Sequence, residues 1–205
     1  MNDALPIAVL VSGSGTNLQA ILDAAAKPGF GARVAVVISD RPKVAALDRA
    51  RAAGVPVATV PWPGAALRSS FTEELCDSAE SHGAELMVLA GFMRILAPVA
   101  MRRFPDAIVN VHPALLPAFP GAHAVEDALA HGVKVSGVTV HIVDEEVDHG
   151  PIVFQEAVPV LSDDTPATLH ERIQKAEHEV YPMVIDAFAR GDIVIDGRIV
   201  TWREG

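Results

Sequence analysis

Short apolar runs rich in valine and isoleucine alternate with alanine-rich stretches, and this alternation limits the possible fold more than any other feature. The apolar runs predict strands at 5–11, 33–39, 55–60, 85–90 and 107–111. The stretches between them predict helices at 17–26, 44–54 and 67–83. Repeats of strand, helix and strand form right-handed units on a parallel sheet. The sequence therefore predicts an α/β protein with a doubly wound, mostly parallel sheet.

The pattern changes after residue 120. The runs at 135–143 and 151–160 are longer and more strictly alternating, which predicts a bent or antiparallel addition to the edge of the sheet. No internal repeat, low-complexity tract or linker interrupts the chain. We therefore expect one domain over residues 1–205, in which residues 1–111 form a nucleotide-binding-like half and residues 112–205 the other half.

A long helix is predicted from Pro166 to about Arg190, with Thr165 as its N-cap and proline at its first position. The short runs DIVI and RIVT then flank Asp196-Gly197, a strong signal for a β-hairpin. The chain is thus expected to end in a long helix followed by a hairpin.

Composition excludes several classes of protein. The formal net charge of -10 argues against a broad surface for nucleic acid or anionic membrane. The single cysteine, Cys76, excludes an internal disulfide and is typical of a reducing compartment. We expect a cytoplasmic protein, because no apolar run is long enough to span a bilayer and the first strand lacks the basic start of a signal peptide.

The loop SGSGTNLQAI, residues 12–21, follows the first predicted strand. Ligands of open α/β sheets bind at the carboxyl ends of strands, and a glycine-rich turn that opens a helix favours an anion there. Leu18 stands where a dinucleotide fingerprint needs glycine, and the lysine of a Walker motif is absent. The loop predicts a cradle for one phosphate, although many such turns hold no ligand.

Three later loops carry further candidates. The apolar loop GFMRIL (91–96) suits either core packing or the wall of a slot for a flat ligand. Asn110 and His112 end a buried strand, and prolines prevent any regular continuation. The acidic loop 144–150 contains Asp148 and is either solvated surface or part of a site. Each loop is ambiguous alone.

Together, four stretches resemble the phosphoribosylglycinamide formyltransferase family of purine synthesis. They are GSGTNLQ (13–19), AGFMRIL (90–96), NVHPALLPAFPG (110–121) and GVTVHIVDEEVDHGP (137–151). The resemblance covers essentially the whole chain and implies a Rossmann-like formyltransferase fold. It implies formyl transfer from 10-formyltetrahydrofolate to the amine of 5-phosphoribosylglycinamide in de novo purine biosynthesis. It also implies small-molecule partners without nucleic acid, membrane or metal, and a monomer or homodimer.

The resemblance further implies a role for individual residues. Gly15, Thr16 and Asn17 would hold the substrate phosphate, and Gln174 and Glu177 would contact the sugar and glycinamide end. His112 and Asp148 would be the catalytic pair, with Asn110 beside them. Residues 112–205 would be the folate-binding half. The residues that would bind the folate are Arg68, Met93, Arg94, Ile95, Leu96, Asn110, Asp144, Glu145, Glu146, Val147 and Asp148.

The chemistry accounts for these residue types. An amine that attacks a formyl carbon creates an oxyanion, which the Asn110 amide can stabilise. His112 can donate a proton when it is cationic, a form that a nearby carboxylate such as Asp148 favours. His123 and His141 are expected to serve in packing or supporting hydrogen bonds, and His149 to be a solvent-facing bystander. The spacing of the histidines matches no familiar zinc motif.

Three other functions stay open at this point. A methionyl-tRNA formyltransferase shares the catalytic stretch but needs more chain and a basic surface. A formyltetrahydrofolate hydrolase usually carries an additional N-terminal regulatory domain. A non-catalytic nucleotide- or folate-binding protein would not need Asn110, His112 and Asp148 together.

Overall fold

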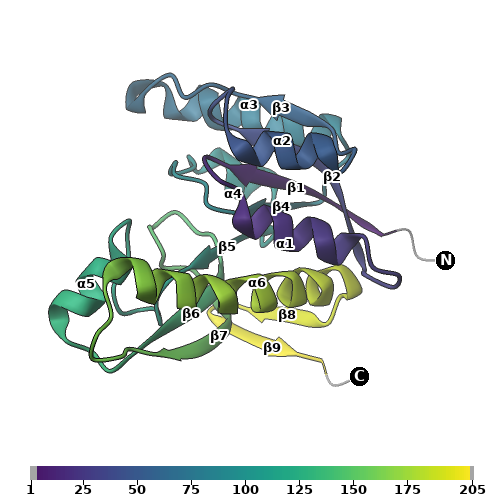
Figure 1. The fold of residues 1–205 in the computed structure, drawn as a ribbon. Helices are drawn as coiled ribbons and strands as arrows, with labels where there is room; N and C mark the ends of the chain where they lie inside the picture. The colour runs from purple at the N-terminus through teal and green to yellow at the C-terminus, as the bar shows by residue number, and fades with distance from the viewer. Residues whose placement is uncertain (1–3, 204–205) are drawn as a thin grey trace.

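A computed structural model describes residues 4–203 of the chain (Figure 1). In chain order the elements are β1 (Leu5–Val11), α1 (Thr16–Ala25), β2 (Ala32–Ser39), α2 (Ala45–Ala52), β3 (Val57–Thr59), a 3-10 turn (Ala65–Leu67), α3 (Arg68–Ser81), β4 (Leu86–Leu89), α4 (Val99–Arg103), β5 (Ile108–His112), α5 (Ala124–His131), β6 (Val135–Ile142), β7 (Ile152–Pro159), α6 (Pro166–Arg190), β8 (Ile193–Asp196) and β9 (Ile199–Trp202).

Seven strands form one sheet in the order β3-β2-β1-β4-β5-β6-β7. The first five strands are parallel, whereas β6 and β7 add to the edge in antiparallel fashion. The predicted doubly wound, mostly parallel sheet and its antiparallel extension are therefore confirmed. The strand order reverses between β1 and β4, so the loops that follow these two strands lie at the topological switch point, where open α/β sheets bind ligands.

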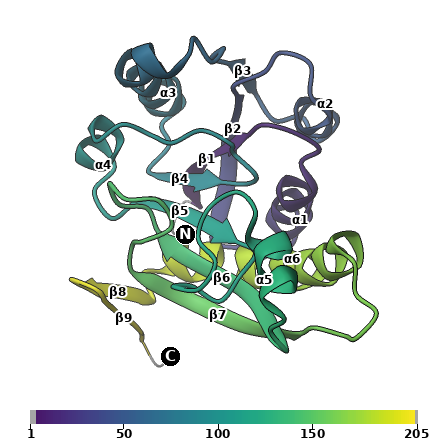
Figure 2. The same ribbon diagram turned by 90° about the vertical axis from the view of Figure 1, so that its left-hand side faces the viewer.

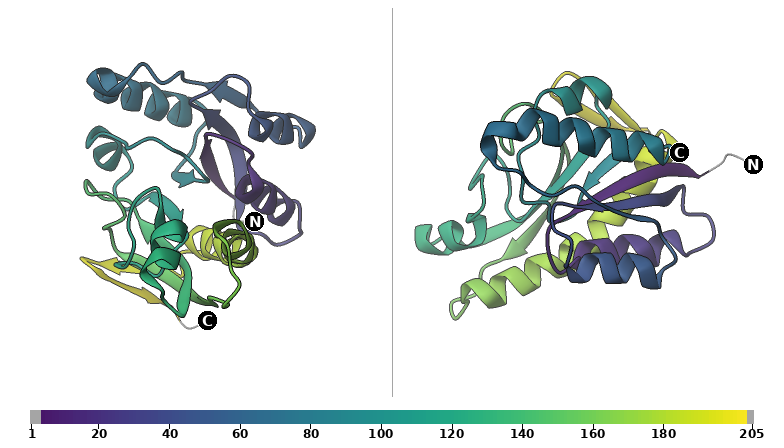
Figure 3. Two further views of the ribbon diagram at one scale, coloured as in Figure 1. Left: turned by 60° about the vertical axis from the view of Figure 1, so that its left-hand side comes forward. Right: turned by 90° about the horizontal axis from the view of Figure 1, so that it is seen from above.

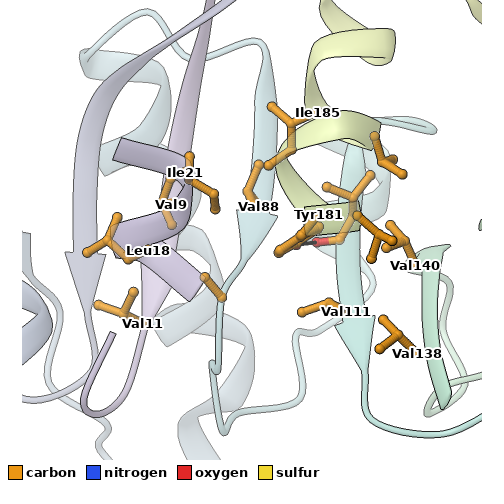
Figure 4. Close-up of a cluster of buried hydrophobic side chains, with 14 of the residues drawn as sticks. Val9, Val11, Leu18, Ile21, Val88, Val111, Val138, Val140, Tyr181 and Ile185 are labelled. Atoms are coloured by element: carbon orange, nitrogen blue, oxygen red, sulfur yellow. Dashed lines mark hydrogen bonds between the residues drawn. The ribbon is translucent and has the colours of Figure 1, made fainter. Parts of the chain in front are cut away.

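Helices cover both faces of the sheet (Figure 2). Alternate residues of β1 show why: Val9 and Val11 pack in one core with α1, α2 and α6, whereas Ala8 and Leu10 pack in the other with α3 and α4. Strands buried on both faces need apolar residues at every position, as the sequence has. Figure 4 shows part of the first core, in which Leu18 and Ile21 of α1 lie near Val9 and Val11.

The long helix α6 lies beside α1 (Figure 3) and contacts β6 and β7. Its N-cap is Thr165, whose side chain accepts a hydrogen bond from the Thr168 N–H, as the sequence predicts for this boundary. The buried Tyr181 hydroxyl donates to the carbonyls of Leu89 and Val109, each 3.0 Å away. One phenol therefore ties α6 to two neighbouring strands, β4 and β5 (Figure 4).

The observed elements differ from the predicted ones mainly in length. The predicted strand 55–60 shrinks to β3, because Pro56 lacks the N–H that a sheet requires and residues 60–64 run on as a loop. The short helices α4 and α5 lie in segments for which no helix is predicted. The C-terminal hairpin forms as expected, with β8 and β9 joined across Asp196-Gly197.

Candidate active site

The pleat of β5 places its two polar side chains together. Val109 and Val111 face the core beneath α6, so Asn110 and His112 project from the opposite face. In the antiparallel register Asn110 pairs with His141 of β6, and directly opposed side chains of such strands lie on one face. The strand end therefore presents an amide and two imidazoles on the α3/α4 side of the sheet.

The ring of His112 is buried and both of its nitrogens face oxygen acceptors. Nε2 lies 2.8 Å from the backbone oxygen of Phe119, which can only accept a hydrogen bond. Nδ1 lies 3.3 Å from Oδ2 of Asp148. Both ring nitrogens of His112 are therefore placed next to oxygen atoms that can accept a hydrogen bond.

His141 joins Asn110 to Asp148. Its Nε2 lies 3.1 Å from Nδ2 of Asn110 and 3.7 Å from Oδ1 of Asp148. Its Nδ1 lies 2.8 Å from the carbonyl oxygen of Ile142, so Nδ1 carries a hydrogen. The ring is only 2 % exposed. His141 therefore makes the hydrogen bonds expected of it and lies between two predicted catalytic residues.

Asp148 adopts a left-handed backbone conformation, with φ 52°, in the loop between β6 and β7. Its Oδ2 accepts a 2.7 Å hydrogen bond from the Gly121 N–H. Burial of the carboxyl group raises its pKa, but the His141 ring, the Gly121 N–H and the charge that His112 can carry lower it by more. The pKa of Asp148 therefore lies below its ordinary value, and the carboxylate is ionised at neutral pH.

The predicted phosphate loop, which begins at residue 12 and leads into α1, is tightly constrained at Gly15. This residue has φ 74°, and a Cβ built on it would lie 2.7 Å from the Ala46 Cβ. The side chain of Asn17, in the first turn of α1, donates a 2.8 Å hydrogen bond to the buried carboxylate of Glu177 on α6. The structure thus brings two predicted substrate residues together, and Gln174 lies one turn earlier on α6.

The 91–96 loop is fastened to the phosphate loop at the switch point. The Met93 N–H donates to the Ser12 hydroxyl at 2.9 Å, and the Ser12 N–H donates to the Gly91 oxygen at 3.2 Å. Met93 and Ile95 are 62 % and 53 % exposed, although both are large and apolar. Exposed apolar side chains at this edge are available to contact a ligand.

Arg94 and Leu96 of the same loop are occupied within the protein. The Arg94 guanidinium group donates to the buried Asp40 carboxylate at 2.7 Å and lies 5.2 Å from the ring centroid of Trp62. Leu96 is buried in the α3/α4 core. Arg94 therefore stabilises the loop through its side chain, which contacts Asp40 and Trp62.

The remaining predicted folate residues are exposed or half-buried. Arg68 is exposed at the start of α3, and Glu145, Glu146 and Val147 are exposed in the 144–150 loop. Asp144 accepts from His149, whose Nδ1 is 2.7 Å from Oδ2. His149 is exposed, as the sequence predicts, and it is also hydrogen-bonded within the loop.

Sequence reasoning did not identify three of the groups that form this site: the hydroxyl of Ser12, the Phe119 oxygen and the Gly121 N–H. Two of these act through the backbone and leave no signal in the residue type. Ser12 precedes the glycine-rich turn and was the one group that its position after a strand could have revealed.

Comparison with known proteins defines the class to which this fold and site belong. Residues 5–185 match the model of the formyl transferase family, and the chain therefore belongs to that family. It is 45% identical over 195 residues to phosphoribosylglycinamide formyltransferase of Mycobacterium tuberculosis, covering 95% of this chain and 90% of that one. It also superposes on glycinamide ribonucleotide transformylase 1 of Symbiobacterium toebii with a TM-score of 0.94, 47% identity, and coverage of 98% and 95% of the two chains.

Longer relatives contain a similar segment. The trifunctional purine biosynthetic protein adenosine-3 of Bos taurus is 42% identical over 195 residues, which is 94% of this chain but 19% of that protein. This chain thus spans about a fifth of the trifunctional relative.

Within residues 4–203, no helix is long and apolar enough to cross a membrane, and no group of three or more histidine, cysteine or acidic residues is placed to hold a metal ion.

Proposed function

We propose that this protein transfers a formyl group from 10-formyltetrahydrofolate to the amine of 5-phosphoribosylglycinamide, a step of purine synthesis. The observation that carries the proposal is the 3.3 Å contact between His112 Nδ1 and Asp148 Oδ2, beside Asn110 at the end of β5. It occurs in a chain similar, over nearly its whole length, to proteins named for this reaction. We also propose that residues 1–205 act as one formyltransferase domain, because a single sheet continues through both halves.

The phosphorylated substrate is proposed to bind at the start of α1. Gly15 allows the backbone to approach the phosphate, and the free N–H groups of Thr16 and Asn17 favour its negative charge. Glu177 and Gln174 on α6 are proposed to hold the sugar and glycinamide. The buried Asn17–Glu177 hydrogen bond supports this assignment, because it places the carboxylate beside the phosphate loop.

The folate supplies the formyl group and is proposed to lie against the 91–96 loop and the 144–148 loop, with Arg68 near its acidic end. The exposed Met93 and Ile95 support this assignment. Arg68 is an exposed cation that suits a carboxylate tail.

Three side chains are proposed to carry the chemistry. The Asn110 amide has two N–H groups, of which one faces His141 and the other can donate to the developing oxyanion. His112, as the imidazolium, donates a proton to the departing nitrogen. The ionised Asp148 stabilises that imidazolium and accepts, directly or through water, the proton that the attacking amine releases. Positioning all three in advance lowers the barrier further.

A spectrophotometric assay with the purified chain tests the function. Formation of tetrahydrofolate from 10-formyltetrahydrofolate should require 5-phosphoribosylglycinamide and should persist with a chelator present. Glycinamide lacking the ribose phosphate is the matched control and should give little product. If tetrahydrofolate formed equally fast with and without the ribonucleotide, the chain would be a hydrolase and the proposal would be contradicted.

A further inference from the structure

The C-terminal hairpin contacts the 144–150 loop through Arg198, which lies in the turn between β8 and β9. Its Nη2 donates a 2.8 Å hydrogen bond to the backbone oxygen of His149. Its Nη1 lies 3.4 Å and 3.5 Å from the two ring nitrogens of His149. These nearly equal distances place the guanidinium group against the ring rather than in line with one nitrogen, a contact that suits a planar cation.

His149 also contacts Asp144, at the start of the loop. Its Nδ1 lies 2.7 Å from Oδ2 of Asp144, whose Oδ1 accepts from the Glu146 N–H at 3.0 Å. The contacts of Arg198, His149 and Asp144 therefore join the two ends of the loop. Asp148 lies between these ends, directly before His149 in the chain.

Asp148 needs such support because of its backbone. A left-handed conformation is unfavourable for a residue other than glycine and persists only where surrounding contacts hold it. Asp148 must keep this conformation for its carboxylate to face both His112 and the Gly121 N–H. The contacts on the adjacent His149 backbone restrict the same stretch of chain.

The hairpin that carries Arg198 is held against β7 and the core by several contacts. The Trp202 indole donates a 3.0 Å hydrogen bond to the Val153 oxygen of β7, and its ring meets Phe154 edge-on at 6.1 Å. Ile193, Ile195 and Val200 pack against the core beneath α6. Figure 2 shows the hairpin beside β7 at the edge of the sheet.

Charge favours the same contact. The loop contains four carboxylates, Asp144, Glu145, Glu146 and Asp148, which repel one another. Arg198 lines a cavity of about 370 Å³ together with Asp144 and Glu145, so its cation lies close to this acidic segment. Removing Arg198 would leave the acidic residues without that charge.

We propose that Arg198 is a positioning residue for formyl transfer. Its contact with His149 holds the 144–150 loop, and with it Asp148, in the conformation that serves folate binding and catalysis. This role rests on the proposed function, and it assigns to the C-terminal hairpin a part in the reaction that does not involve contact with either substrate.

Kinetics of Arg198→Ala test the proposal. The KM for 10-formyltetrahydrofolate should rise and kcat should fall, each by about 3- to 10-fold, the range for a charged hydrogen bond weakened by solvent. The KM for 5-phosphoribosylglycinamide should stay unchanged, because its proposed residues lie on α1 and α6. Arg198→Lys should not restore the kinetics, since an ammonium lacks the planar fork. Arg203→Ala, at an exposed arginine beyond the same hairpin, is the matched control.

Amide hydrogen exchange separates this proposal from the proposed function. Amides of residues 145–150 should exchange faster in Arg198→Ala but not in Arg203→Ala, whether or not the chain transfers formyl groups. An unmodified chain without transferase activity would refute the function, and the role of Arg198 in holding the loop would then depend on exchange alone. Arg198→Ala is expected to leave exchange elsewhere unchanged. Kinetics and loop exchange equal to those of Arg203→Ala, or equal loss of affinity for both substrates, would overturn the proposal.

Discussion

Single residues decide the local geometry of the proposed site, and Gly15 shows how strictly. Two independent constraints act there: the left-handed backbone, and the Ala46 side chain where a Cβ would lie. Gly13, in the same loop, has neither constraint, since a Cβ added there would meet nothing within 4 Å and its φ is outside the left-handed range. Gly15 is therefore required by the fold, whereas the fold does not require glycine at position 13.

Gly15→Ala should lower the free energy of unfolding by roughly 2–5 kcal/mol, from left-handed strain of about 1–2 kcal/mol and overpacking of about 1–3 kcal/mol. Gly13→Ala should remain within about 0.5 kcal/mol of the unmodified protein. Urea denaturation of both variants checks the difference. Equal stability of the two variants would show that the Gly15 contact with Ala46 is relieved by movement of α2.

Individual residue types predicted some features of the proposed site and not others. The pattern of Asn110 and His112 on a buried strand correctly places both side chains on one face, because the strand period is two. The partners of His112 could not be predicted in this way. Phe119 and Gly121 contribute backbone atoms, and their positions depend on the path of an irregular loop rather than on a periodic signal.

Among the elements, α6 has the largest influence on the proposed site. It carries Gln174 and Glu177 and is tied to β4 and β5 by Tyr181. Burial raises the pKa of Tyr181 well above its ordinary value, with a further contribution from Glu177. The phenol therefore stays protonated, and keeps donating to both carbonyls, throughout the neutral and mildly alkaline range.

Tyr181→Phe should reduce the free energy of unfolding at pH 7 by about 1–3 kcal/mol, because two buried carbonyls lose a donor. The pH dependence gives a second signature. A raised pKa in the folded state means that the stabilisation is complete below the unfolded value of about 10 and declines as the pH rises above it. Denaturation of both proteins between pH 7 and 11 checks this, and the variant should lack that alkaline decline. The same alkaline loss in Tyr181→Phe would assign it to other groups.

Long elements were predictable from sequence, and short ones were not. The strands of the sheet, α6 and the hairpin have strong periodicity, capping residues or a turn dipeptide. By contrast, α4 has only five residues, too few for a helical pattern to stand out, and α5 was missed although it is as long as the predicted α2. The Arg198 contact was equally hidden, because it joins two loops that are 49 residues apart in sequence.

At the scale of the whole molecule, the sheet topology assembles the proposed site. The phosphate loop and the 91–96 loop meet because the strand order reverses between β1 and β4. His112 and Asp148 meet because β6 returns antiparallel to β5 and its following loop folds back over the strand end. A doubly wound sheet was predictable from the alternation of strands and helices, whereas the distances within the site come from this global arrangement.

The central claim is that His112 and Asp148 act as one unit, and a double-mutant cycle on kcat tests it most directly. His112→Ala and Asp148→Asn should each lower kcat by about 10²–10⁴-fold, the usual loss on removing a positioned acid or its partner. The double variant should lose far less than the product of the two single losses, since neither residue works fully without the other. Losses that simply multiply would show that the two residues act independently and would contradict the mechanism.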